Sequence, residues 1–173
     1  MPYIPVAVVE SGGGSGGGLF DAYAQVSYTQ PQGTDGGSST GGSDQVFPIN
    51  TEDFDPSGLL SLPGSNQIDL TVGTYWVEGW LMVTQPNARA RSKLRNVTDG
   101  SDLVYGRSYY HAGTTLQFSD YVPLRGRFTI ASTKTLELHY IIQGAGTNTE
   151  GLGISTNMFG PEKYAELTFW REA

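Results

Sequence analysis

The sequence predicts an all-β sandwich on three observations. Apolar residues alternate with polar ones along strand-length runs, and turn-forming residues separate these runs. No pattern with the 3.6-residue period of an amphipathic helix lies between them. The chain has 24 glycines among 173 residues, only 16% charged residues and no cysteine, so it is rich in turns and has no disulfide to support it. A chain of this length can bury about two-thirds of its unfolded surface. One domain held together by packing alone is therefore expected.

The chain is expected to begin with a short arm. Residues 2–9 form an apolar stretch, and the glycine-rich residues 12–18, which have few side chains to pack, follow as a hinge. The predicted division is an arm and glycine hinge in residues 1–18 and a sandwich domain in residues 19–173. Two interpretations of the arm stay open: it pairs with the edge of the protein's own sheet, or it anchors on a partner protein through Tyr3, Ile4, Val6 and Val8.

A second glycine-rich segment precedes the predicted strands. Residues 32–44 are almost wholly Gly, Ser, Thr and Asp, which predicts an exposed, mobile loop. From residue 68 onward, alternate residues are apolar and are predicted to share the core face of each strand. These core-facing sets are Ile68, Leu70 and Val72; Tyr75, Val77, Leu81 and Val83; Phe128 and Ile130; Leu136, Leu138, Tyr140 and Ile142; and Ala165, Leu167 and Phe169.

Two predicted strands carry large aromatic residues on the face opposite their core set. Trp76 and Trp80 share that face in one strand, with Glu78 between them, and Tyr164 and Trp170 share it in the last strand. Trp and Tyr dominate the energetics of protein interfaces, so these rings are explained by a subunit interface, for example in a cyclic trimer. The alternative is that loops or the arm of the same chain cover them.

Four cations also alternate along one run. Arg89, Arg91, Lys93 and Arg95 are expected to line one face of a strand. Three interpretations stay open: a solvated face or guarded sheet edge, a site for an anionic ligand, and a contact with acidic side chains of a neighbouring subunit.

The sequence contains motifs that resemble catalytic ones but lack their context. Residues 13–17 and 37–41 both match Gly-x-Ser-x-Gly, yet neither lies in the strand-to-helix turn that exposes a nucleophile. The only two histidines, His111 and His139, are too few for a metal site without further ligands and have no assignable nucleophile. His139 is expected to be half-buried and hydrogen-bonded within a strand, with a pH-sensitive subunit contact as the alternative.

Composition and charge limit the kinds of ligand, partner and cellular location that can be expected for this protein. Carboxylates cluster in turn-like sequence at residues 52–55 and 99–102, where they more readily cap their own backbone than bind calcium. We expect no enzymatic activity, no cofactor and no metal. The formal charge of −7 opposes nucleic-acid binding. No run approaches the roughly 20 apolar residues of a membrane span, and the first residues do not resemble a secretory signal, so a chain made in the cytoplasm without membrane insertion is expected.

Several motifs, taken in their order, resemble a module of phage virion proteins that includes tail-fibre tips. They are LRNVTDG (residues 94–100), RGRFT (125–129), TLEL (135–138), GLGI (151–154) and the closing residues 164–170. In addition, GTY at residues 73–75 is similar to the Gly-x-Tyr strand of the C1q and tumour necrosis factor (TNF) superfamily. The resemblance covers residues 20–173.

The resemblance implies a fold and an assembly. The fold is a C1q/TNF-like jelly-roll sandwich of ten strands, preceded here by the short N-terminal arm, and the assembly is a tight homotrimer. In that superfamily the Gly-x-Tyr strand and the last strand lie on the threefold side. By position, the resemblance therefore implies that Trp76, Glu78, Trp80, Tyr164 and Trp170 lie near the subunit boundary.

The resemblance also implies a place on the virion surface. Fibre proteins have a long shaft before the tip, whereas only about twenty residues precede the domain here. An arm and a knob therefore favour a capsid decoration, or cement, protein whose arm seats on the major capsid protein. The alternative is a tail-fibre or spike tip, in which loops with Tyr105, Tyr109, Tyr110 and His111 bind a host surface saccharide or protein.

Overall fold

The structure is a computed structural model that describes residues 18–64, 66–84, 89–110, 119–143 and 150–173. These ranges contain strands, turns and loops, and no helix that could cross a membrane. The strands are β1 (Phe20–Gln30), β2 (Gln45–Val46), β3 (Thr51–Phe54), β4 (Leu60–Gly64), β5 (Gln67–Leu70), β6 (Gly73–Thr84), β7 (Arg89–Asn96), β8 (Ser101–Tyr105), β9 (Tyr109–Tyr110), β10 (Ser119–Ile130), β11 (Lys134–Ile142) and β12 (Glu162–Glu172).

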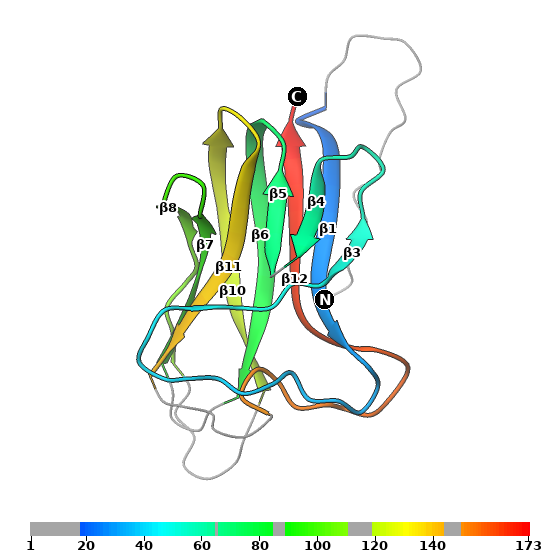
Figure 1. Ribbon diagram of the computed structural model, residues 1–173, viewed down its shortest axis with the longest axis vertical. Helices are drawn as coiled ribbons and strands as arrows, with labels where there is room; N and C mark the ends of the chain where they lie inside the picture. The colour runs from blue at the N-terminus through cyan, green and yellow to red at the C-terminus, as the bar shows by residue number, and fades with distance from the viewer. Residues whose placement is uncertain (1–17, 65, 85–88, 111–118, 144–149) are drawn as a thin grey trace.

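The strands form two antiparallel sheets that pack face to face (Figure 1). The first sheet has the order β10-β6-β12-β1-β3, and the second has the order β4-β5-β11-β7-β8, to which β2 and β9 add short pairings. The long-range pairs are nested: β1 pairs with β12, β5 with β11, β6 with β10, and β7 with β8. This nesting defines a jelly roll, so the predicted fold class is confirmed, with twelve strands in the described residues where the resemblance implied ten.

The core lies between the two sheets and contains nearly all of the predicted core-facing residues. Tyr75, Leu81, Leu138 and Phe169, for example, are fully or almost fully buried. Val72 is the exception, since it is 55% exposed. Strand β5 ends at Leu70, so the alternation of the strand no longer determines which way Val72 points.

The prediction that Tyr164 lies on the outer face with Trp170 is wrong, because Tyr164 is buried in the core. The pairing of β1 with β12 shifts register between Tyr28 and Thr29, and across this irregularity Tyr164 and Ala165 are both buried. The Tyr164 hydroxyl donates a 2.7 Å hydrogen bond to the carbonyl of Thr34.

The segment of residues 32–44, predicted to be an exposed, mobile loop, is attached to the sandwich. It crosses the lower end of the sandwich (Figure 1), and backbone hydrogen bonds attach it to the loop after β11 and to the end of that strand. The Gly36 amide donates to the carbonyl of Gly153, and the Gly42 amide donates to that of Ile142. Although much of the segment is exposed, Ser39 within it is buried, so the tract is part of the folded structure.

Candidate functional site

The outer face of the first sheet carries aromatic side chains in register across neighbouring strands. Tyr23 of β1 lies opposite Trp170 of β12, and Trp170 lies opposite Trp76 of β6. Phe54 of β3 stacks on Tyr23 with ring centroids 4.7 Å apart, and Phe20 lies against Trp170 at 6.4 Å. These five side chains are termed the aromatic row. Phe54 is 41% exposed and Phe20 is 37% exposed, while the other three are half-buried.

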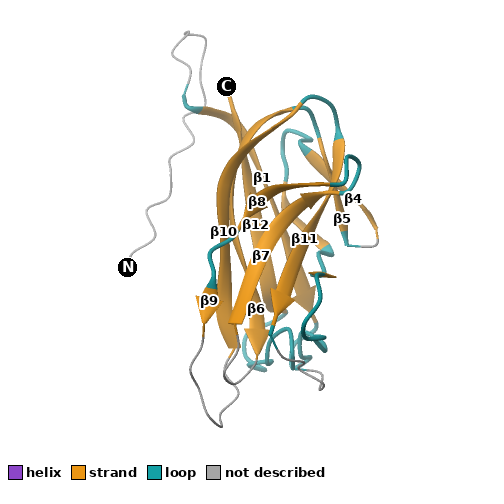
Figure 2. Cartoon of the chain, turned by 90° about the vertical axis from the view of Figure 1, so that its left-hand side faces the viewer, coloured by secondary structure: helices purple, strands orange, loops and turns teal. Residues whose placement is uncertain are grey.

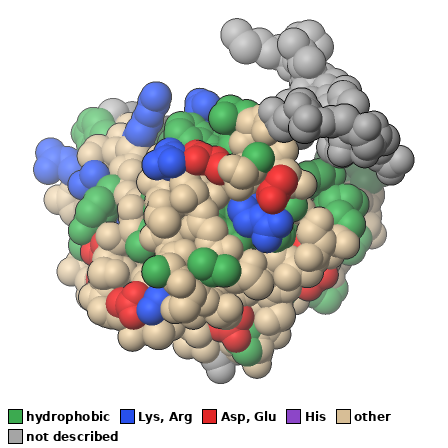
Figure 3. Space-filling view, turned by 90° about the horizontal axis from the view of Figure 1, so that it is seen from above, with side chains coloured by type: hydrophobic (Ala, Val, Ile, Leu, Met, Phe, Trp, Pro, Cys, Tyr) green, Lys and Arg blue, Asp and Glu red, His purple; other side chains and the backbone are tan. Residues whose placement is uncertain are grey.

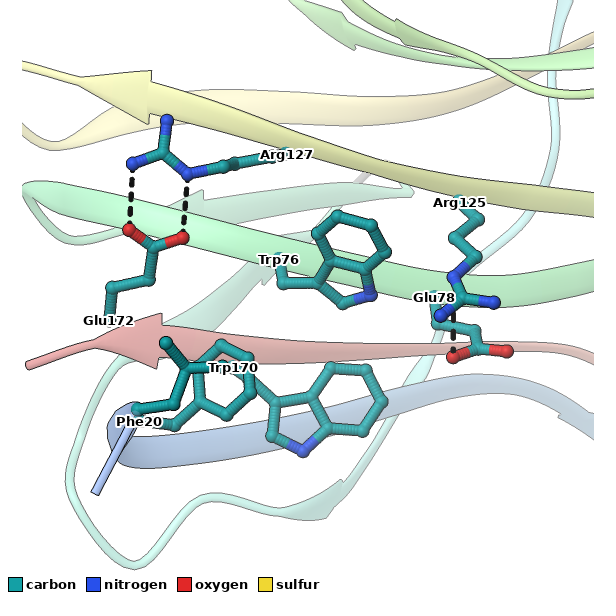
Figure 4. A pocket seen from close by; sticks show the side chains of 8 residues that line it. Phe20, Trp76, Glu78, Arg125, Arg127, Trp170 and Glu172 are labelled. Atoms are coloured by element: carbon teal, nitrogen blue, oxygen red, sulfur yellow. Dashed lines mark hydrogen bonds and ion pairs between the residues drawn. The ribbon is translucent and has the colours of Figure 1, made fainter.

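Two arginines of β10 continue this face beside the aromatic row (Figure 4). Arg127 lies opposite Trp76 in register and donates two hydrogen bonds, of 2.6 and 2.7 Å, to the carboxylate of Glu172. These bonds lower the pKa of Glu172 and raise that of Arg127. The guanidinium of Arg125 lies 5.1 Å from the centre of the Trp76 ring and 4.0 Å from the carboxylate of Glu78. The charges next to the row are thus paired within the chain.

A shallow hollow of about 500 Å³ opens where the aromatic row meets these ion pairs. Its lining consists of Leu19, Phe20, Trp76, Glu78, Arg125, Arg127, Trp170 and Glu172. At the upper end of the molecule, apolar side chains lie among adjacent basic and acidic ones (Figure 3). Farther along the outer face, Trp80 packs edge-on against Tyr121, which is 56% exposed. The described part of the chain therefore leaves a broad aromatic surface partly open to solvent.

The structure brings together four of the five residues that the resemblance implied for the subunit boundary. Trp76, Glu78 and Trp80 alternate with buried residues along β6 and share the outer face with Trp170, whereas Tyr164 does not join them. Sequence analysis missed Tyr23, although it too is followed by inward residues at alternate positions, Ala24 and Val26 in β1.

The four cations of β7 lie on the outer face of the second sheet, as predicted. Lys93 and Arg95 are neutralised within the chain: Lys93 is 2.6 Å from a carboxylate oxygen of Asp44, and Arg95 is 2.9 Å from Asp102. Burial opposes the charge of Lys93, but the hydrogen bonds to Asp44 and Asp102 outweigh it and raise the pKa of Lys93. Lys93 and Arg95 therefore stabilise the fold by linking β7 to Asp44 and to Asp102 of β8.

His139 belongs to the same network. Its Nδ1 is 3.0 Å from Asp44 and its Nε2 is 3.0 Å from Glu137, and the residue is 8% exposed. The predicted hydrogen bonding of this strand histidine is confirmed, although the residue is buried and not half-buried. Through Asp44, the imidazole also attaches the end of the segment of residues 32–44 to the second sheet.

The tyrosines expected in recognition loops lie in strands instead. Tyr105 is the last residue of β8, and Tyr109 and Tyr110 form β9, because both short strands pair with the backbone of β7. Tyr105 and Tyr110 are 56% and 58% exposed, and guanidiniums of β7 lie over their rings: Arg91 is 5.0 Å from the Tyr105 centroid and Arg89 is 5.7 Å from that of Tyr110. His111 and the proposed anchor residues Tyr3, Ile4, Val6 and Val8 lie outside the described residues.

The carboxylates in the two turn-like segments, residues 52–55 and 99–102, form hydrogen bonds within the chain. Asp55 accepts hydrogen bonds of 2.9 and 2.8 Å from the backbone amides of Leu59 and Leu60, and Asp99 accepts one of 2.6 Å from Lys134. Within the described ranges, no three His, Asp or Glu side chains are grouped so that they could hold a metal ion.

Comparison with known proteins finds similarity in solved structures only. No family model matches the sequence, and no curated protein matches it. Crystal structures of murine APRIL at pH 8.5 and at pH 8.0 are each similar to this chain with 9% sequence identity and a TM-score of 0.49, over 87% of this chain and 98% of the APRIL chain. The class of protein is accordingly defined by the strand order: a two-sheet jelly roll with an aromatic outer face.

Proposed function

We propose that this protein is a non-enzymatic virion surface protein of a bacterial virus, in which three copies of the chain join through the outer face of the first sheet. The trimer decorates the capsid, and the arm in residues 1–18 seats on the major capsid protein. The observation that carries the proposed self-association is the aromatic row, whose rings lie side by side on a face that the described residues leave partly open.

Physical chemistry favours covering this face with protein. Burying a large apolar side chain contributes roughly 1.5–3 kcal/mol, and monomeric proteins rarely expose large contiguous apolar patches. The nearby charges are paired, Arg127 with Glu172 and Arg125 with Glu78, so burying this face would leave neither guanidinium without a carboxylate partner. The threefold arrangement and the viral setting follow from the resemblance of the motifs along the chain.

Light scattering on the purified protein tests the assembly. The expected mass is three times the 18.6 kDa of one chain. Trp76→Lys should lower the mass to that of one chain, whereas Ile141→Lys, an exposed apolar position on the outer face of the other sheet, should leave it unchanged. A wild-type protein that stays monomeric at high concentration would overturn the proposed interface.

Deletion of residues 1–18 tests the anchor. The shortened chain should keep the mass of a trimer but no longer sediment with capsids that lack the decoration protein. The motivation is the apolar stretch with Tyr3, Ile4, Val6 and Val8, followed by glycines. Undiminished capsid binding by the shortened chain would contradict an anchoring role for the arm.

A second candidate function is recognition of the host surface, as in a tail-fibre or spike tip. The observation that favours it is the pair of exposed tyrosines, Tyr105 and Tyr110, that lie under the guanidiniums of Arg91 and Arg89. Exposed tyrosines are rigid, amphipathic contact groups typical of recognition surfaces. Binding of the purified protein to host cells, together with its absence from isolated heads, would favour this candidate over capsid decoration.

A further inference from the structure

The cation row of β7 has two halves with different surroundings. Lys93 and Arg95 contact carboxylates, whereas Arg89 and Arg91 form no ion pair within the described part of the chain. Both arginines are exposed, and a tyrosine ring lies beside each guanidinium. The protein has a net charge of −7, yet it keeps two unneutralised guanidiniums close together on one strand face.

A hollow of about 600 Å³ opens beside these two arginines. It lies beside the first residues of β7, where β9 pairs with them, and Figure 2 shows these two strands on the side that faces the viewer. Tyr110 and Ile141 supply apolar surface, and Ile141 of β11 is paired in register with Arg91. Ile141 is 44% exposed, so the hollow has an open apolar wall next to a concentrated positive charge.

One guanidinium is held in place by the fold. The Nε of Arg91 donates a 3.0 Å hydrogen bond to the carbonyl of Gly106, and the guanidinium lies over the ring of Tyr105. The Arg91 guanidinium is thereby pre-oriented, and its planar fork of N–H donors is the geometry that matches a carboxylate. Arg89 lies two residues away on the same face, about 7 Å along the strand, so both cations can reach one small ligand.

We propose that this hollow binds an acidic saccharide, with Arg89 and Arg91 contacting its carboxylate and with Tyr110 and Ile141 packing against the sugar ring. A pyranose has polar edges and apolar C–H faces, which suit a lining of guanidinium, hydroxyl and hydrocarbon. The inference deepens the host-recognition candidate above by naming its ligand class, and it does not depend on the trimer.

Other anionic ligands fit the surface less well. An inorganic anion would use the guanidiniums but leave the apolar wall and most of the hollow unused. An extended acidic peptide gains much of its affinity by pairing with a free strand edge, and β7 is already paired with β11 on one side and with β8 and β9 on the other. A nucleic acid would meet the repulsion of a chain with a net charge of −7.

Titration calorimetry with the full chain tests the proposal, with trigalacturonate and trisialic acid as probes. At least one of these should bind, and the methyl ester of that same saccharide, in which uncharged ester groups replace the carboxylates, should bind at least about tenfold more weakly. Arg89→Gln and Arg91→Gln should each weaken binding about tenfold, since each removes a charge-assisted contact. Lys134→Gln, which removes a cation at the opposite end of β11, should leave binding unchanged.

The same titrations can overturn the proposal. Failure of both acidic saccharides to bind, equal binding of the ester, or equal weakening by Lys134→Gln would each overturn it, as would equal or tighter binding of inorganic phosphate or a tetra-aspartate peptide. Light scattering on the same samples reports the trimer separately. A trimer that binds no acidic saccharide would therefore remove this inference and leave the proposed assembly intact.

Discussion

Trp76 and Trp170 lie directly opposite each other across the pairing of β6 with β12, on the outside of the sandwich. The two strands are far apart in the chain, so the jelly-roll topology itself creates this pair. Tyr23 extends the pair on one side and Arg127 on the other, each in register with its neighbour. A face of this kind has the aromatic centre and paired polar surroundings of a protein interface.

If the proposed trimer forms through this face, Trp170→Ala should weaken it by about 2 kcal/mol or more, roughly a thirtyfold increase in its dissociation constant, because a central tryptophan is the usual interface hot spot. Analytical ultracentrifugation over a range of protein concentrations measures the change. Val72→Ala, which trims an exposed apolar residue beyond the end of β5, serves as the matched control and should leave dissociation unaltered. Equal dissociation constants for Trp170→Ala and the wild type would remove this tryptophan from the interface.

Gly153→Ala should lower the free energy of unfolding by more than about 2 kcal/mol. Gly153 has a φ of 124°, and a Cβ there would overlap the ring of the buried Tyr164. Backbone strain and overpacking therefore act together at this position. Chemical denaturation of the purified variant measures the loss.

Gly100→Ala separates the two causes. Gly100 also has a positive φ, of 68°, but an added Cβ would contact nothing within 4 Å. Its substitution should therefore cost only the strain of the left-handed backbone, about 1 kcal/mol. Similar losses for Gly100→Ala and Gly153→Ala would show that the Tyr164 ring is not packed against Gly153 as described.

The faces of the long strands could be predicted from sequence wherever the ladder is regular. Alternation placed Trp76 and Trp80 opposite Val77 and Leu81 correctly, because successive side chains of a strand point to opposite sides. The same rule failed for Tyr164, because a register irregularity in the pairing of β1 with β12 breaks the alternation. Such irregularities depend on the partner strand and leave no mark in local sequence.

Two other features needed the tertiary structure. Strand β9 has only two residues, which is too short for an alternation of apolar and polar residues to be recognised. The sequence therefore predicted a loop at Tyr109 and Tyr110, although both pair with β7. The alignment of Tyr23 with Trp170 depends on the register between the first and last strands. Sequence alone could have placed Tyr23 on an outer face, but it could not have placed it beside that tryptophan.

Ser27→Ala should raise the free energy of unfolding by about 1 kcal/mol. The Ser27 side chain is fully buried, and its hydroxyl has no hydrogen-bond partner among the described residues. Removing it relieves the cost of an unpaired polar group. Ser92→Ala is the matched control, because the Ser92 hydroxyl is equally buried but donates a 2.9 Å bond to the carbonyl of Pro123. That change should destabilise the protein, and destabilisation of similar size by Ser27→Ala would contradict the prediction.

Glu162 should make stability depend on pH in the acidic range. Its carboxylate accepts hydrogen bonds from the amides of Thr156 (3.1 Å), Gly33 (3.2 Å) and Asn157 (2.7 Å), and so joins two loops at the lower end of the sandwich. These bonds, with that from Thr156 the largest influence, hold the pKa of Glu162 below its ordinary value of 4.5. The contribution to stability is therefore complete above that ordinary value, and it is lost as pH falls through the lower pKa of the folded state.

Thermal unfolding of Glu162→Gln and of the wild type, compared at about pH 7 and about pH 3, measures this contribution. The wild type should unfold at a clearly higher temperature near neutral pH, since the ionised carboxylate accepts bonds that a single amide oxygen cannot all replace. In acid the two midpoints should approach each other, because the protonated wild-type side chain loses the same advantage. Glu52→Gln removes a charge from an exposed position of β3 and should change the midpoint little at either pH. A Glu162→Gln deficit of equal size at both pH values would mean that ionisation of this carboxylate does not stabilise the two loops.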